Sequence, residues 1–350
     1  MEYRKLGKSG IKVSTVSAGC WSFGGGGYWG PQEQSDVEKV VNRALDEGVN
    51  FFDTAELYNN GESERSLGKA LGERRRDAVI CSKVSPNNGY YGTIIEHCNA
   101  TLKRLGTDYL DIYMLHWPIN YRAVLHFTSD KDILANPPRI EETMAAMEEL
   151  KKQGTIRGVG ISNFGPLQMK EALVTGTRID VNEMAYSIFS RAIEKEIVPF
   201  CIENGIAVIG SMPLMQGLLT GKYTSPDQVP MNQAHSRHYA DSRGLGTSRH
   251  GGEGAEKEMF AALEELKKVA AECGTTLARL SIAWTLHKPG IASAIVGCRN
   301  ISQLEENIGA AELSLSEDTV REIDRISQPV LDILGYSADY YESIENSRIR

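Results

Sequence analysis

The sequence predicts an α/β fold in which eight parallel strands, each followed by a helix, close into a (β/α)₈ TIM barrel. Apolar runs typical of buried strands alternate with amphipathic helical patterns eight times within the 350 residues. Glycine follows several of the helical patterns, as in "ALDEG", "LKKQG" and "CIENG", and marks where those helices end. This alternation predicts a parallel sheet covered by helices. Eight such units in a chain of this length favour a closed barrel over an open doubly wound sheet.

Each predicted element has its own local pattern. The strands are short apolar runs, placed at residues 13–19, 50–53, 79–83, 109–116, 156–162, 180–185, 206–211 and 292–296. The helices have apolar residues at three- and four-residue spacing, at 35–47, 63–71, 93–105, 141–153, 166–174, 194–203, 256–271 and 302–310. The opening "YRKLGKSGIKV" holds two short β-like runs around a glycine-bearing turn, which predicts a hairpin ahead of the barrel.

The domain organisation follows from the regular alternation. Because no linker-like stretch interrupts it, we expect one domain over residues 1–350, with the barrel at about 13–327 and a C-terminal tail at 328–350. Two connections, 117–139 and 212–255, are longer than turns, and in a barrel both lie on the C-terminal face. We interpret them as functional loops, with a plain solvent-exposed loop as the alternative for the second.

The composition excludes several classes of function. A formal net charge of −8 argues against a nucleic-acid surface or an anionic membrane as partner. No apolar run approaches the roughly 18 residues of a membrane span, and the amino terminus lacks the apolar core of a leader peptide. The six cysteines are scattered without metal-ligand spacing, which is typical of reduced thiols. We therefore expect a cytoplasmic protein with no nucleic-acid, membrane or metal partner.

Ionisable residues end three consecutive predicted strands. Asp53 ends the strand in "GVNFFDTAELYNNGESERSLGKAL", Lys83 ends "VICSK" and His116 ends "YMLH". Tyr58 follows Asp53 by five positions. The carboxyl ends of parallel barrel strands surround one mouth, so these four side chains are expected to meet there. A lysine at the end of an apolar strand needs a carboxylate partner, and Asp53 is the nearest candidate.

This set of residues suits proton transfer to a carbonyl oxygen. A tyrosine has an unperturbed pKa of about 10, and a neighbouring ammonium group is expected to lower it. Tyr58 would then act as a general acid while a hydride reaches the carbonyl carbon, with His116 orienting the carbonyl group. Taken singly, Asp53 and His116 have ordinary structural alternatives, but the group of four favours an active site.

These stretches resemble the aldo-keto reductase family. Residues 48–64 match its pattern G-x-x-x-x-D-T-A-x-x-Y-x-x-G-x-S-E, and Lys83 and "LHWP" at 115–118 stand where the family places its lysine and histidine. The resemblance runs from about residue 3 to residue 326. It implies a catalytic tetrad of Asp53, Tyr58, Lys83 and His116, with Tyr58 as proton donor, and a nicotinamide dinucleotide as cofactor.

Polar residues after the later strands provide a possible cofactor site, although no Rossmann G-x-G-x-x-G follows a strand. Ser162 and Asn163 could bond a carboxamide, and the ring of Tyr186 could stack on a nicotinamide. Ser211 begins a loop that suits a pyrophosphate, and Arg299 precedes a predicted helix start, where anions bind. Each has a structural alternative: a turn for Ser162 and Asn163, a core position for Tyr186, and a solvated helix face for the residues near 303–307.

The family resemblance implies a fuller set of contacts. The residues that it implies for the cofactor are Cys20, Trp21, Asp53, Ser162, Asn163, Glu183, Tyr186, Ser211, Met212, Pro213, Leu214, Gly217, Lys222, Gly297, Arg299, Gln303, Glu306 and Asn307. Those that it implies for the substrate are Trp21, Tyr58, His116 and Trp117. Glu183 departs from the glutamine of many members; an ionised glutamate only accepts hydrogen bonds and favours the cationic, oxidised nicotinamide.

The cofactor and substrate expectations follow from single residues. Arg299 can make bidentate bonds to a 2′-phosphate, so we expect NADP(H) to be preferred and NAD(H) to be possible. The substrate is expected to be a small carbonyl compound or alcohol, in a pocket built from Trp21, Trp29, the loop after Trp117 and the 212–255 loop. Nearby basic residues suit a sugar or polyol, or simply an exposed loop: Arg122, Arg237, His238 and Arg243.

Two other functions stay open. Potassium-channel β subunits resemble this family, which makes a cofactor-sensing regulatory subunit one alternative. A barrel lyase or epimerase that uses Tyr58 and Lys83 without net redox change is the other. A nicotinamide-linked assay with a panel of carbonyl compounds separates the reductase from both.

Overall fold

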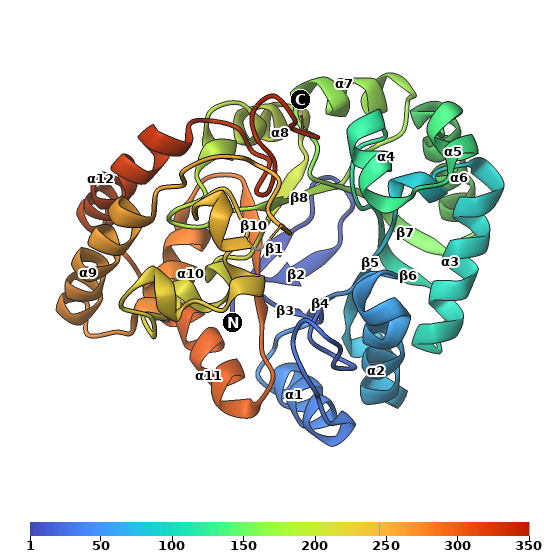
Figure 1. Ribbon diagram of the computed structural model, residues 1–350. Coiled ribbons are helices and arrows are strands. Elements are labelled where there is room, and N and C mark those ends of the chain that lie inside the picture. Colours follow the sequence, from blue (N-terminus) through green and yellow to red (C-terminus); the bar gives the residue numbers. More distant parts are fainter. Residues whose placement is uncertain (245, 350) are drawn as a thin grey trace.

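The computed structural model describes residues 1–244 and 246–349. Leu245, in the predicted seventh loop, and Arg350, at the end of the predicted tail and domain, lie outside the described residues. Within the described ranges, eight parallel strands close into a barrel surrounded by helices, as the sequence predicts (Figure 1). In barrel order the strands are β3 (Val16–Gly19), β4 (Phe51–Asp53), β5 (Val79–Val84), β6 (Leu110–Leu115), β7 (Ile156–Ser162), β8 (Val181–Ala185), β9 (Ala207–Ser211) and β10 (Ile291–Gly297).

Helices follow the strands around the outside of the barrel (Figure 1). Their bounds are α1 (Gln34–Asp46), α2 (Glu62–Leu71), α3 (Tyr91–Leu105), α4 (Tyr121–Phe127), α5 (Lys131–Ala135), α6 (Ile140–Lys152), α7 (Pro166–Val174), α8 (Ile197–Asn204), α9 (Glu256–Glu272), α10 (Leu277–His287), α11 (Ile301–Gly309) and α12 (Glu317–Leu334).

Four of these helices correct the predicted element list. Helices α4 and α5 lie within the loop that was expected to be irregular, and α12 extends into the predicted tail, which therefore begins after Leu334. Helix α10 has no polar stripe, because it is buried between the barrel and its neighbours; its apolar sequence lacks the alternation by which helices are recognised.

The predicted hairpin is present, but it takes part of the predicted first strand. Strand β1 (Tyr3–Lys5) pairs antiparallel with β2 (Lys12–Ser14), and the barrel strand β3 starts only at Val16. Apolar side chains of the hairpin pack into the barrel interior: Leu6, Ile11 and Val13. The hairpin therefore closes the amino-terminal end of the barrel and leaves the carboxyl ends of the strands as the mouth.

Strand alternation decides which charged residues face the interior. Phe51 on β4, Cys81 on β5 and Val181 on β8 belong to the core inside the barrel. Side chains two positions further along a strand lie on the same face. Asp53, Lys83 and Glu183 therefore point inward at the top of three strands, above the apolar filling.

The C-terminal tail, drawn in dark red in Figure 1, crosses the face of the barrel beside the loop that follows β9, drawn in gold. The backbone amide of Arg237 in the loop donates to the carbonyl oxygen of Tyr340 in the tail over 3.0 Å, and Arg249 forms an isolated bridge with Glu342. Among the residues described, no helix has the length and apolar character needed to cross a membrane.

Candidate active site

Lys83 is the centre of a buried polar cluster at the mouth. Its side chain is completely buried, and its ammonium group donates to the carboxylate of Asp53. The same group donates to the carbonyl oxygen of Thr54 over 3.1 Å and to the Tyr58 hydroxyl over 3.3 Å. Parallel pairing aligns Asp53 with Cys81, two residues before Lys83, which brings the two strand ends together. The predicted association of Asp53, Tyr58 and Lys83 is thus present in the structure.

The electrostatics of this cluster differ in one respect from the expectation. Burial raises the pKa of Tyr58 above its usual range, and the carboxylates of Asp53 and Glu183 add to the rise, while Lys83 lowers it. The predicted effect of Lys83 has the right sign but is smaller than the cost of burying a phenolate. Tyr58 is therefore a neutral phenol at neutral pH, the form that donates a proton.

Lys83 and Asp53 support each other in the charged form. Burial is the largest single effect and lowers the pKa of Lys83, but the neighbouring groups, Asp53 first and then Glu183, together hold the pKa well above its ordinary value. Burial raises the pKa of Asp53, and the Lys83 ammonium group opposes that rise. Neither charge would be tolerated at this depth without the other.

His116 lies beside Tyr58 directly after β6. The two rings are edge to face, with centroids 5.8 Å apart. Burial and the nearby positive charge of Lys83 lower the pKa of His116 well below its usual value, so the imidazole is neutral. Its Nδ1 makes no hydrogen bond to the described residues. A neutral imidazole with a free nitrogen can orient a carbonyl group but does not compete with Tyr58 as an acid.

Several of the predicted cofactor residues gather around the same mouth. The Ser162 hydroxyl donates to the carbonyl oxygen of Glu183 over 3.2 Å, and the Asn163 amide donates to the carbonyl oxygen of His116 over 3.2 Å. Asn163 has a φ of 62°, a conformation in which few non-glycine residues are found. These contacts join the ends of β6, β7 and β8 into one polar rim.

The segment after β9 has an unusual backbone. Met212, Met215 and Gln216 have φ values of 56°, 46° and 56°, and Gly217 follows with a φ of 98°. Such conformations cost of order 1–3 kcal/mol each and are concentrated at ligand-binding sites. This strained turn (residues 211–217) contains the predicted pyrophosphate residues Ser211, Met212, Pro213, Leu214 and Gly217. The ammonium group of Lys222 lies against Gly217, where an added Cβ would be 2.9 Å from it.

Two predicted cofactor residues do not face the mouth. Tyr186 is 1% exposed; its ring packs 5.3 Å from that of Trp284, and its hydroxyl donates to Glu194 over 2.7 Å. It therefore fits the alternative of a core residue. Cys20 is fully buried in the core outside the barrel strands. Strand alternation explains why Tyr186 faces away from the barrel interior, because it lies three positions beyond Glu183, which faces inward.

The start of α11 brings together most of the residues predicted for the adenosine end. Asn300 caps the helix by accepting from the Gln303 amide over 2.9 Å, while the Gln303 side chain accepts from the Arg299 amide over 2.9 Å. The Asn307 side chain donates to the carbonyl oxygen of Gly297 over 3.3 Å. Glu306 forms an ion pair with Arg279 over 3.0 Å. The sequence pattern does not single out Arg279.

The guanidinium group of Arg299 is already engaged by the loop after β3. It donates to the Gln32 side chain over 2.8 Å, to the carbonyl oxygen of Trp29 over 2.7 Å and to that of Pro31. Arg299 therefore holds this loop against the start of α11. Of its five N–H groups, these contacts leave some for a further anion.

The family is shown by comparison with known proteins. A model described as Aldo/keto reductase family matches residues 15–328. The chain belongs to the aldo/keto reductase family. It is an oxidoreductase of that type, which confirms the resemblance that the sequence predicts.

Three known proteins illustrate the likeness of this aldo-keto reductase. A probable voltage-gated potassium channel subunit beta of Arabidopsis thaliana is 34% identical over regions covering 89% of this chain and 92% of that protein. An NADH-specific methylglyoxal reductase of Escherichia coli is 31% identical, covering 89% of this chain and 94% of that protein. An aldo-keto reductase from Klebsiella pneumoniae, crystallised with NADPH, has a TM-score of 0.69 at 25% identity, with coverage of 94% and 96%.

The mouth of this aldo-keto reductase is lined by aromatic rings. Trp21 stacks on Tyr58 and on Tyr28, with centroids 5.8 Å and 4.9 Å apart. His235 of the loop after β9 packs on Tyr28 at 6.4 Å and stacks on Tyr341 of the tail at 5.0 Å. The sequence pattern predicts Trp21 here but not Tyr28, His235 or Tyr341, because their loops have no periodicity.

Trp117, predicted to touch the substrate, supports the tail. The Arg348 guanidinium lies 3.7 Å from the centroid of the Trp117 ring and forms a buried ion pair with Asp339 over 2.7 Å. The carbonyl oxygen of Arg348 accepts from the side chains of Asn120 and Gln168 over 2.8 and 2.9 Å. One face of Trp117 is thus occupied by the protein itself.

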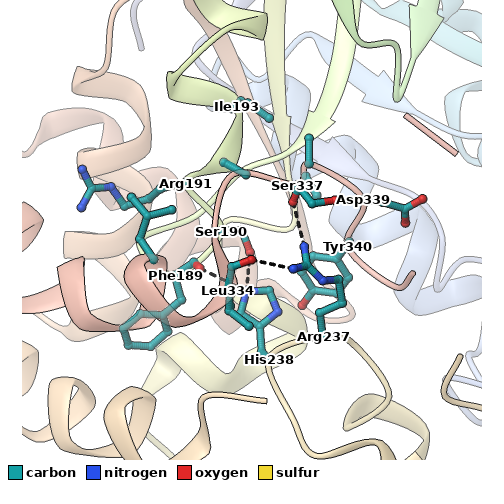
Figure 2. A pocket seen from close by; sticks show the side chains of 15 residues that line it. Phe189, Ser190, Arg191, Ile193, Arg237, His238, Leu334, Ser337, Asp339 and Tyr340 are labelled. Atoms are coloured by element: carbon teal, nitrogen blue, oxygen red, sulfur yellow. Dashed lines mark hydrogen bonds between the residues drawn. The ribbon is translucent and has the colours of Figure 1, made fainter. Parts of the chain in front are cut away.

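The basic residues suggested to contact a sugar or polyol instead make hydrogen bonds and ion pairs with other residues of the chain. Figure 2 shows Arg237 and His238 beside a cavity of about 30 Å³, large enough for a water molecule. Arg237 donates to the carbonyl oxygens of Ser337 and Leu334, and the His238 ring is hydrogen-bonded to Phe189 and Ser190. Arg122 contacts the carbonyl oxygen of Glu345, and Arg243 pairs with Asp227 and Glu256.

Proposed function

We propose that this chain is an NAD(P)(H)-dependent oxidoreductase that reduces an aldehyde or ketone, or oxidises the matching alcohol, with Tyr58 as proton donor or acceptor. The observation that supports this best is the fully buried Lys83, which contacts both Asp53 and the Tyr58 hydroxyl. Such a cluster is costly to bury, and a buried group of charge-paired ionisable residues at the open end of a barrel is a candidate for a functional site.

The residues divide the work of proton transfer among them. Tyr58, neutral at neutral pH, donates its proton to the carbonyl oxygen, and Lys83 stabilises the phenolate that remains. Asp53 keeps Lys83 charged and in place. Neutral His116 hydrogen-bonds the carbonyl oxygen and fixes its direction toward Tyr58. A bound nicotinamide dinucleotide supplies or takes up the hydride.

The mouth fits such a cofactor. The strained turn at 211–217 presents backbone groups beside Lys222, and the capped start of α11 offers an anion site. In this proposal Ser162 and Asn163 bond the carboxamide, and Gln303 and Asn307 hold the adenosine end. We keep NADP(H) as the preferred form and NAD(H) as possible: one related protein is named for NADH and another was crystallised with NADPH.

Arg299→Ala is expected to remove the preference for NADPH. A charged hydrogen bond contributes about 1.5–3 kcal/mol, so NADPH affinity should fall roughly 10- to 200-fold. The measurement is the pair of dissociation constants for NADPH and NADH in the parent and in the variant.

The contacts of Arg299 determine how this experiment is interpreted. Freeing the loop at 29–32 is expected to weaken the binding of both cofactors equally. Only a change in the ratio of their two dissociation constants therefore reports on the contact with the 2′-phosphate. Arg279→Ala is the matched control, because it removes another guanidinium group that pairs with a residue of α11. Equal constants in the parent, or loss of the preference in Arg279→Ala alone, would contradict the assignment to Arg299.

The substrate is proposed to be a carbonyl compound with a polar carbon skeleton, such as a sugar, or the matching polyol. The rings at the mouth offer flat surfaces, and Trp29 Nε1 and His116 Nδ1 are buried without a hydrogen-bond partner among the described residues. Buried polar atoms usually have partners, and hydroxyl groups of a substrate can provide them. This support comes from Trp29 and His116 and not from the basic residues, which are paired.

A panel of carbonyl compounds tests the function and the substrate class together. With NADPH we expect turnover of several aldehydes, measured as the loss of the reduced-nicotinamide absorbance. We also expect a lower KM for hydroxylated aldehydes than for apolar ones of equal length. The relative named as a potassium channel subunit makes a regulatory subunit the second candidate. Cofactor binding without turnover of any member of the panel would favour that candidate.

A further inference from the structure

Glu183 adds a second carboxyl group to the buried cluster. It is the middle residue of β8, is 5% exposed, and points into the barrel above Val181. Its Oε2 is 3.3 Å from the Lys83 ammonium nitrogen. Asp53 contacts the same ammonium group from β4, and the two carboxyl groups are within hydrogen-bonding reach of each other. One lysine is therefore shared by two buried carboxyl groups.

The charges around Glu183 do not balance if both carboxyl groups are ionised. The titratable groups that face it are Asp53 from β4, Tyr58 from the turn after β4, and Cys81 and Lys83 from β5. Burial keeps Tyr58 and Cys81 neutral, because it raises the pKa of both. A single positive charge thus faces two acids, and an unpaired buried carboxylate is strongly disfavoured.

The cluster avoids this imbalance by keeping one proton. Burial and then the negative charge of Asp53 raise the pKa of Glu183 to about 8, against the opposing effect of Lys83. At neutral pH Glu183 is thus largely protonated and donates to Asp53. A glutamine at this position would make a similar hydrogen bond but has no proton to lose.

We propose that Glu183 is a positioning residue that acts through Asp53 and Lys83, and that it releases its proton to solvent when an oxidised, cationic nicotinamide binds at the mouth. The inference rests on the proposed cofactor. A protonated Glu183 leaves the Asp53–Lys83–Glu183 cluster neutral, whereas an ionised one gives it a net negative charge. That negative charge attracts and stabilises the cationic nicotinamide. It gives no such stabilisation to the reduced form, because the reduced ring is neutral.

The sign of the pH effect follows from linkage. Below about pH 8, the oxidised cofactor releases the Glu183 proton on binding, so its affinity relative to the reduced form rises with pH. The ratio of the two dissociation constants should change by up to about tenfold per pH unit. Above about pH 8 the proton is already lost and the ratio levels off.

Proton release is the direct test. Calorimetric titrations of NADP⁺ and NADPH, in buffers of different ionisation enthalpy at neutral pH, count the protons released by each. The difference between the two cancels any contribution of their shared 2′-phosphate. We expect the parent to release up to about one proton more with NADP⁺ than with NADPH, and Glu183→Gln to show no difference. Glu64→Gln, which removes a buried carboxylate paired with Arg104, is the control and should behave like the parent.

The outcomes separate this inference from the proposed function. If both cofactors bind with equal proton release in the parent, or if Glu183→Gln keeps the difference, Glu183 does not have this role, while the reductase proposal stands. If neither cofactor binds, both proposals fail together.

Stability without cofactor provides a check that does not depend on binding. The folded-state pKa of Glu183 lies above its unfolded value, so its contribution to stability is full at acid pH and is lost as the pH rises to about 8. Between these limits the melting temperature of the parent should fall more than that of Glu183→Gln. Parallel melting curves would overturn the protonation assigned to Glu183.

Discussion

Replacing Tyr58 with phenylalanine is expected to lower carbonyl reduction by about 10²–10⁴-fold, the usual value of a general acid. The substitution removes the hydroxyl that lies 3.3 Å from the Lys83 ammonium group and leaves the ring that stacks on Trp21. Cofactor affinity and melting temperature should therefore stay near the parent values. The measurement is single-turnover reduction with saturating cofactor, together with cofactor dissociation constants.

A matched variant distinguishes loss of the acid from a general disturbance of the mouth. Tyr28→Phe removes a hydroxyl from the neighbouring ring of the same aromatic cluster, beyond Trp21. The rate of the chemical step in this variant should stay close to that of the parent, although KM can change. Activity of Tyr58→Phe within a few-fold of the parent would remove Tyr58 from its assigned role.

Lys83→Met is expected to be at least as damaging to activity and to reduce stability as well. Breaking a buried pair by removing one partner typically costs about 3–5 kcal/mol, and here Asp53 and Glu183 both lose their positive partner. The two carboxyl groups are then stable only when protonated. The stability of the variant should therefore fall further as the pH rises. Urea unfolding at several pH values measures this loss.

A double variant tests the physical cause of that loss. Lys83→Met combined with Asp53→Asn removes both charges of the pair, so it should recover part of the stability. It should not recover activity, because Tyr58 still lacks the ammonium group that stabilises its phenolate. Full activity of Lys83→Met would refute the assignment of the cluster to catalysis.

Much of the candidate site could be predicted because it lies at strand ends. Asp53, Lys83 and His116 each end or directly follow an apolar run, and parallel strands in a closed barrel bring such ends to one mouth. The alternation of side chains along a strand also predicts which way each side chain faces, and residue type alone does not predict this. Counted from the inward Glu183, it indicates that Tyr186 faces outward, as its contacts with Trp284 and Glu194 show.

The loops could not be predicted in the same way. The stack of Arg348 on Trp117 joins residues 231 positions apart, and that of His235 on Tyr341 joins a loop to the tail. Arg299 reaches back to Trp29, Pro31 and Gln32. These partners belong to segments without periodicity, so no local pattern indicates which residues will meet.

The sequence by itself determined the barrel and the residues that stand at its mouth, because both depend on local periodicity and on the order of the strands. Only the tertiary structure decided the charge balance among those residues. The cost of burying Tyr58 outweighs the nearby ammonium group, and Lys83 faces Glu183 as well as Asp53. Depth of burial and the distance between strands that are not neighbours set these energies, and both arise only when the barrel closes.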